Sequence, residues 1–158
     1  MEHNPESRLR KLGFELPDVP APAGAYVPAT RAGNLIFTAG QLPLEGGELN
    51  LRGKVGDAVE PDQARDAARL CALNALAAAA TQTGGLSGIS RIVKVTGFVA
   101  SAPGFNGQPQ VLDGASEFLG EVFGGAGRHA RSAVGVAELP LAAPVEVELV
   151  VEAATDTD

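Results

Sequence analysis

The sequence contains few of the residues that metal, redox and base-stacking chemistry require. Its 158 residues include one cysteine, two histidines and no tryptophan. The lone Cys71 cannot form an internal disulfide, and we expect it to be a buried, inert thiol. Two histidines without a Cys/His cluster do not make a metal centre, so no metal site is predicted. A platform for stacking nucleic-acid bases would have to come from six phenylalanines and one tyrosine.

Positive charge is scarce as well. Twelve lysines and arginines stand against nineteen aspartates and glutamates, which gives a net charge of −7 at pH 7. A protein that binds a phosphate backbone needs a surplus of cations, so no nucleic-acid partner is expected. No window is long and apolar enough to cross a membrane, and the N-terminus lacks the apolar segment of a signal peptide. We therefore expect a cytoplasmic protein without a membrane partner.

The most regular feature of the chain is an alanine-rich segment between residues 63 and 83. Its composition predicts a long helix that begins at Pro61 and ends before Gly84 and Gly85. Apolar residues at helical spacing predict a second helix over residues 110–123. A short helix is expected over residues 5–12, with Asn4 as its N-cap.

Strand patterns occupy the rest of the chain. Residues 25–27 and 35–38 predict a hairpin, residues 49–55 a short strand and residues 92–100 a longer one. Residues 131–152 predict a final hairpin joined at residues 139–144. In its second strand Val145, Val147, Leu149 and Val151 alternate with three glutamates, the period expected of a half-buried strand.

These elements predict an α+β fold in the order β-β-β-α-β-α-β-β. We expect a mixed six-stranded sheet with two helices packed on one face. The strand at 92–100 is expected to lie parallel to an earlier strand. The length fits a single domain at 25–153, preceded by an extension at 1–24 with a short helix and a proline-rich segment, and followed by an acidic tail at 154–158.

Several ordered motifs carry a family resemblance. They are Gly-Asn-Leu-Ile-Phe-Thr-Ala-Gly-Gln-Leu-Pro at 33–43, Gly-Lys-Val-Gly at 53–56, Ala-Arg-Ser at 130–132, Val-Gly-Val-Ala-Glu-Leu-Pro at 134–140 and Val-Glu-Val-Glu at 145–148. Together they resemble the RidA/YjgF family of reactive-intermediate imine and enamine deaminases, also labelled L-PSP endoribonuclease-like. The chain looks like a longer, divergent branch. The resemblance implies a YjgF-like (chorismate-mutase-like) fold, no cofactor, and a homotrimer with pockets between subunits.

The resemblance also implies roles for particular residues. Arg131 matches the arginine that grips the carboxylate of a 2-imino or 2-keto acid, and a guanidinium suits this because it offers two parallel donors. Glu146 matches the glutamate that handles a water or proton at the imine carbon. Tyr26 matches an aromatic residue that lines the pocket, and the backbones of Gly40 and Ser132 match groups that contact the substrate. From spacing alone, Arg131 is better explained as a strand-end arginine in a salt bridge, and Glu146 could equally be part of a solvated acidic face.

Three pocket positions depart from the family pattern. Ala39 stands where a serine is frequent, Ala133 where a cysteine is frequent, and Asp113 where many members carry an asparagine on the second helix. An aspartate near Arg131 would compete for the guanidinium and weaken anion binding. His129 precedes Arg131 closely and could contact the ligand or cap the strand.

Three functions are compatible with these residues. The first is hydrolysis of 2-imino acids or enamines to 2-keto acids and ammonia, with Arg131 and Glu146 as the catalytic pair. The second is a binding or regulatory module that holds a small carboxylate without turnover. The third is the ribonuclease activity in the family label, which the acidic charge argues against.

Overall fold

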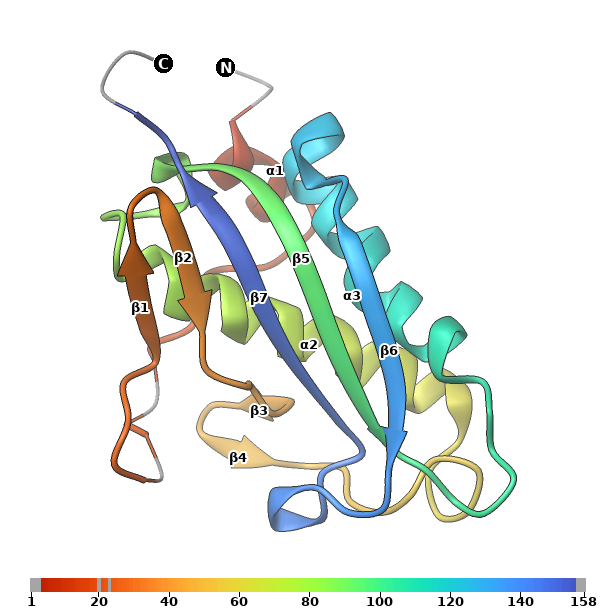
Figure 1. Ribbon diagram of the computed structural model, residues 1–158. Coiled ribbons are helices and arrows are strands. Elements are labelled where there is room, and N and C mark those ends of the chain that lie inside the picture. The colour runs from red at the N-terminus through yellow and green to blue at the C-terminus, as the bar shows by residue number, and fades with distance from the viewer. Residues whose placement is uncertain (1–3, 20, 23, 156–158) are drawn as a thin grey trace.

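The structure is a computed structural model that describes residues 4–19, 21–22 and 24–155, and it confirms the α+β class. Two layers are visible in Figure 1, with helices α2 and α3 lying behind a twisted sheet. The sheet has five strands in the order β1-β2-β7-β5-β6. Their bounds are Ala29–Ala32 (β1), Leu35–Thr38 (β2), Ile89–Ala100 (β5), Ala130–Val136 (β6) and Val145–Ala153 (β7).

The predicted sixth strand of the sheet is wrong. Within residues 49–55, Leu49 ends a separate two-stranded hairpin formed by β3 (Leu44–Glu45) and β4 (Glu48–Leu49). Val55 makes only isolated bridges to Val59 and Ser101. Gly53 and Gly56 have φ of 124° and 93°, outside the region of extended strands, so they interrupt the segment.

The strand order also corrects two predicted neighbours. β6 and β7 do not form a hairpin, because β5 lies between them and pairs parallel with β6 and antiparallel with β7. Contrary to the prediction, β5 is also not paired with any earlier strand. Its parallel neighbour is the later strand β6, and α3 lies in the connection between the two. β7 occupies the centre of the sheet, where β2 and β5 take both of its edges. The connection from β6 to β7 contains the 3₁₀ turn Pro140–Ala142 (η3) and spans the intervening strand.

The three helices confirm the predicted segments. They are α1 (Pro5–Lys11), α2 (Pro61–Ala80) and α3 (Gln108–Phe123). At the start of α1 the side chain of Asn4 accepts hydrogen bonds from the backbone N–H groups of Glu6 (2.8 Å) and Ser7 (3.2 Å). Leu9 of α1 is buried in the core, so α1 is docked on the body of the protein. Two further 3₁₀ turns are Leu86–Gly88 (η1) and Gly124–Gly127 (η2).

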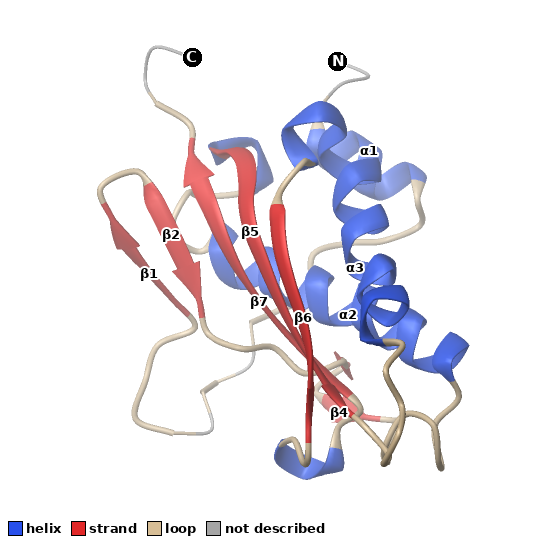
Figure 2. Cartoon of the chain, turned by 45° about the vertical axis from the view of Figure 1, so that its right-hand side comes forward, coloured by secondary structure: helices blue, strands red, loops and turns tan. Residues whose placement is uncertain are grey.

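The core lies between the helices and one face of the sheet, and the turned view in Figure 2 shows these two layers. A stripe of small residues on α2 is fully buried: Ala64, Ala68, Cys71 and Ala75. The predicted alternation of β7 is confirmed, since Val145, Val147, Leu149 and Val151 are buried and its glutamates are partly exposed. Burial raises the pKa of the Cys71 thiol well above its ordinary value, and the thiol donates to the carbonyl of Val145 at 3.5 Å. A protonated, enclosed thiol is a poor nucleophile.

The beginning of the first strand differs from the prediction. β1 starts at Ala29, and Tyr26 lies before it with 51% of its surface exposed. Pro28 has no N–H to donate to a ladder, although its carbonyl accepts from Ala39 at 2.8 Å. His3 and residues 156–158 of the acidic tail lie outside the described residues. No helix in the described part of the chain is long and apolar enough to cross a membrane.

Candidate functional site

Arg131 lies on β6, an edge strand, and its side chain turns toward α3. Its partner across the parallel pair is Val95, which is buried and also pairs with Leu149 in the layer under the helices. Cross-strand partners share a face, so Arg131 lies on the helix-covered face. One guanidinium nitrogen, Nη1, donates to the Asp113 carboxylate at 2.8 Å. The other, Nη2, donates to the backbone carbonyl of Pro109 at 3.3 Å.

The structure places the Asp113 carboxylate in contact with the Arg131 guanidinium. The Arg131 side chain is 23% exposed, so the ion pair is partly shielded from water. Because the Arg131 guanidinium already donates to the Asp113 carboxylate, it has fewer donors left for the carboxylate of a ligand. Asp113 therefore lies where it would compete with a bound anion for Arg131, as expected from the sequence.

Ser116 is the residue of this group that the sequence reading missed. Its hydroxyl oxygen accepts from Nη1 of Arg131 at 3.1 Å and lies 2.9 Å from Nε2 of His129. The other ring nitrogen of His129, Nδ1, lies 2.6 Å from the carbonyl of Gly127. A carbonyl can only accept, so Nδ1 carries the proton, and in the neutral ring Nε2 accepts from Ser116. The spacing of Asp113 and Ser116 was the available signal, because residues three apart share a helix face.

Glu146 lies on the opposite face of the sheet from Arg131. It pairs across β5 with Phe98, and Phe98 pairs in turn with Val134 of β6. The neighbouring Gly97 faces the helices, because a Cβ there would collide with Leu112 of α3. Alternation puts Phe98, and with it Glu146, on the face that carries no helix among the described residues.

Gly40 and Glu146 form the second part of the predicted site. A Cβ added at Gly40 would lie 2.8 Å from the carboxyl carbon of Glu146, so a side chain there would displace this carboxyl group. The adjacent Gln41 pairs with Val147 through two backbone hydrogen bonds, of 2.8 and 3.0 Å. Burial, and then the nearby Glu148 carboxylate, raise the pKa of Glu146. This is the direction that a proton-transferring carboxylate needs.

The predicted site residues thus fall into two groups that one chain does not bring together. Arg131, Asp113 and Ala133 lie on the helix side of the β6 edge. Ala39, Gly40 and Glu146 lie where β2 meets β7, and Tyr26 lies just before β1. Ser132 pairs with Thr96, which also pairs with Glu148, so its side chain shares the helix-free face.

We expect Glu146→Gln to be more stable than the parent protein at pH 7. Because the folded-state pKa is raised above its ordinary value of 4.5, ionisation of Glu146 is penalised only in the folded protein. The penalty is absent below pH 4.5, develops as pH rises through the raised pKa and is complete above it. Urea unfolding from pH 4 to 8 should therefore show that the free energy of unfolding of Glu146→Gln exceeds that of the parent protein by an amount that grows with pH.

The control for this prediction is Glu121→Gln, which removes an exposed carboxylate of α3. Its free energy of unfolding should stay close to that of the parent protein over the same pH range. A Glu146→Gln variant that is destabilised equally across the range would contradict the prediction.

Comparison with known proteins agrees with this architecture. Residues 6–153 match the family model described as "YjgF/chorismate mutase-like, putative endoribonuclease". A protein named TCP17 from Trypanosoma cruzi is 40% identical over 147 residues, covering 92% of both chains. A 2-iminobutanoate/2-iminopropanoate deaminase from Dermatophagoides farinae is 33% identical over 135 residues, covering 85% of this chain and 91% of the relative. The crystal structure of a protein of unknown function from Agrobacterium tumefaciens is 46% identical, with a TM-score of 0.88 and coverage of 95% and 92%.

The fold and the two site groups define an α+β protein with an edge-strand arginine and a half-buried glutamate on a central strand. The chain belongs to the YjgF/chorismate mutase-like family.

Proposed function

We propose that the protein hydrolyses 2-imino acids or their enamine tautomers to 2-keto acids and ammonia. Membership of the family supports this, as does the relative from Dermatophagoides farinae whose name states that activity. The observation that carries the proposal is the pair of unlike sites: a guanidinium able to hold a carboxylate, and a carboxyl group with a raised pKa. No cofactor takes part in this chemistry.

The pocket is proposed to form between two copies of the chain. Arg131 and Glu146 of one copy lie on opposite faces of the sheet, so a neighbouring copy would supply the missing partner. The helix-free face carries two exposed apolar side chains, Phe37 (41% exposed) and Val134 (44% exposed), which suit contact with another copy. The family resemblance favours a homotrimer.

The proposed reaction begins when Arg131 holds the substrate carboxylate. Glu146 takes a proton from water as the water oxygen bonds to the imine carbon, and the π electron pair of the C=N bond moves to nitrogen, which receives that proton from Glu146. In the resulting carbinolamine Glu146 transfers the hydroxyl proton to the amino nitrogen as the C–N bond breaks, and ammonia and the 2-keto acid are released. Backbone groups of Gly40 and Ser132 would hold the substrate, beside Ala39 and Ala133, and Tyr26 would cover it. The cytoplasm, where such imines are free to form, is the proposed location.

The assay uses an amino-acid oxidase to generate 2-imino acids and semicarbazide to trap them. The proposal predicts that the protein lowers the amount of trapped product. Unchanged trapping across several side chains, with folded protein, would exclude it. RNA cleavage is not proposed, since the net charge of −7 disfavours a polyanion.

A second candidate is binding of a small carboxylate without turnover, and the Arg131–Asp113 ion pair favours it. We expect Asp113→Asn to bind 2-oxobutanoate more tightly, by roughly two- to ten-fold, because it removes the competing charge. Isothermal titration calorimetry measures this directly. Glu117→Gln is the matched control, because it neutralises a carboxylate on the same helix that pairs with Arg65 instead.

The opposite result is equally informative. Weaker binding by Asp113→Asn, with Glu117→Gln unchanged, would mean that Asp113 orients the guanidinium rather than competing for it.

A further inference from the structure

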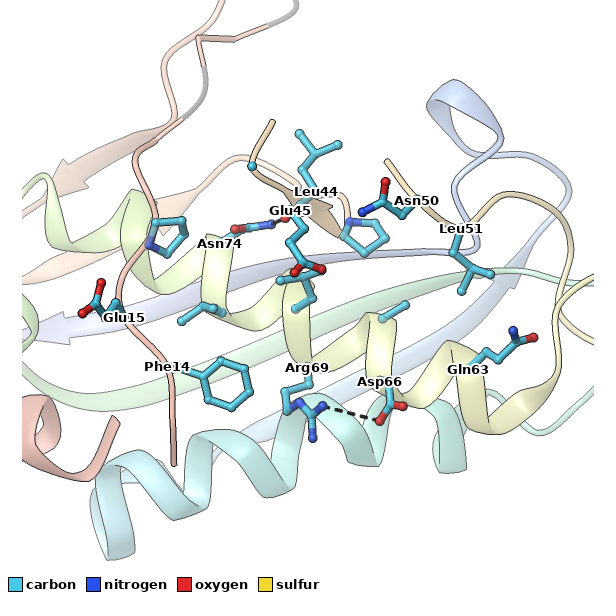
Figure 3. A pocket seen from close by; sticks show the side chains of 16 residues that line it. Phe14, Glu15, Leu44, Glu45, Asn50, Leu51, Gln63, Asp66, Arg69 and Asn74 are labelled. Atoms are coloured by element: carbon cyan, nitrogen blue, oxygen red, sulfur yellow. Dashed lines mark hydrogen bonds and ion pairs between the residues drawn. The ribbon is translucent and has the colours of Figure 1, made fainter. Parts of the chain in front are cut away.

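A cavity that shares no lining residue with the proposed deaminase site lies between α2, the β3–β4 hairpin and the N-terminal segment. It encloses about 530 Å³, a volume typical of small-molecule sites. Figure 3 shows its side chains converging from these three segments. On α2 the lining residues recur at helical spacing and form a different stripe from the one packed on the sheet: Gln63, Asp66, Ala67, Arg69, Leu70, Leu73 and Asn74.

The walls of the cavity are mainly apolar. Phe14 and Pro17 come from the N-terminal segment, Leu44 from the hairpin, and Leu70 and Leu73 from α2. Such a surface excludes water from the apolar part of a ligand and favours its burial. A ligand of this cavity therefore has an apolar body.

The polar groups around these walls carry net negative charge. Glu15, Glu45 and Asp66 contribute three carboxylates against the one guanidinium of Arg69, which gives −2. The guanidinium is already engaged, since it lies 3.6 Å from Asp66 and stacks on the Phe14 ring at 5.4 Å. Figure 3 shows the Glu45 side chain extending from the hairpin toward α2. The charge balance favours a cation.

Asn74 supplies an independent indication. The residue is only 4% exposed, and its amide nitrogen donates to the carbonyls of Leu42 (3.0 Å) and Leu44 (2.9 Å). Its carboxamide oxygen accepts no hydrogen bond from any described residue, although every fully buried side-chain polar atom there has a partner. This oxygen is therefore not fully buried, it belongs to a residue that lines the cavity, and it has capacity to accept from an N–H or O–H donor.

We propose that this cavity binds a small organic ammonium ion with an apolar body. The ammonium group donates to the Asn74 oxygen and lies among the carboxylates, and the apolar part fills the space between Phe14, Leu70 and Leu73. The site shares no residue with the proposed deaminase pocket, so either proposal can be disproved while the other stands.

The test compares three probes of similar shape on the full chain: 2-phenylethylamine, the neutral 2-phenylethanol and the anionic 3-phenylpropanoate. Titrations followed by ¹H–¹⁵N correlation spectra should show saturable shifts at residues 44–47 and at the Asn74 side-chain amide with the amine. Binding should weaken in the order amine, alcohol, carboxylate. Equal binding of the alcohol, tighter binding of the carboxylate, or absence of saturation in the millimolar range would overturn the proposal.

Matched variants locate the charge effect. Glu45→Gln should weaken binding of the amine roughly two- to five-fold, as expected for a partly exposed ion pair. Glu48→Gln removes the same charge from the neighbouring strand of the hairpin, outside the cavity lining, and should change the affinity much less. Leu70→Lys places a competing ammonium in the cavity and should abolish binding, while a thermal melt verifies folding. Equal effects of Glu45→Gln and Glu48→Gln would also overturn the proposal.

Discussion

Arg131→Ala is expected to lower kcat/KM for 2-imino acids by roughly 10²–10³-fold. The substitution removes the fork of donors proposed to hold the substrate carboxylate. It also leaves the Asp113 carboxylate without its partner, 2.8 Å away in the parent protein, so the site becomes repulsive to an anion. Arg131→Lys keeps the charge but not the two parallel donors, and should retain only a small part of the activity.

The control is Arg65→Ala. Arg65 also pairs with a carboxylate of α3, but with Glu117 and not with Asp113, so its loss should leave the activity near that of the parent protein. The semicarbazide assay at several substrate concentrations measures both variants. Full activity in Arg131→Ala would contradict the proposed mechanism.

Mixing two inactive variants tests whether the pocket is shared between copies. Arg131→Ala supplies intact Glu146, and Glu146→Gln supplies intact Arg131. In a randomly mixed oligomer, about a quarter of the interfaces would receive both native residues, so activity should reappear after co-refolding. Failure to recover activity, with mixed oligomers present, would place the pocket within one chain.

The elements that sequence reasoning predicted well are those defined by local periodicity. Alternation along residues 145–152 predicted which face of β7 is buried, and the alanine-rich run predicted α2. Each of these patterns depends only on the geometry of its own strand or helix. The α+β class followed from the order of the elements, because helices of this kind must cover a sheet face.

Strand neighbours were harder to predict because pairing is not a local property. A strand, a short connection and another strand suggest a hairpin, yet β5 lies between β6 and β7. The position of β5 between β6 and β7 determines which faces of the sheet Arg131 and Glu146 occupy. The faces of Arg131 and Glu146 can be compared only through their shared partner β5, and that register placed them on opposite sides. The cavity beside Asn74 likewise required knowing that the N-terminal segment and the hairpin meet on α2.

The close packing of α2 on α3 predicts a large effect from one methyl group. A Cβ at Gly114 of α3 would lie 2.9 Å from the carbonyl carbon of Arg65 on α2, and closer still to its oxygen. Backbone atoms of a core helix cannot move aside as a side chain would. Gly114→Ala should therefore lower the free energy of unfolding by about 3 kcal/mol, at the upper end of overpacking effects.

Gly120→Ala on the same helix separates this effect from helix propensity. A Cβ at Gly120 meets no atom within 4 Å, so alanine there should stabilise the protein by about 0.5–1 kcal/mol. The same substitution thus has opposite effects on stability at two positions six residues apart on one helix, and urea unfolding at pH 7 measures both. If Gly114→Ala were as stable as Gly120→Ala, the two helices would have to lie farther apart than described, and Arg65 would no longer limit the side chain at position 114.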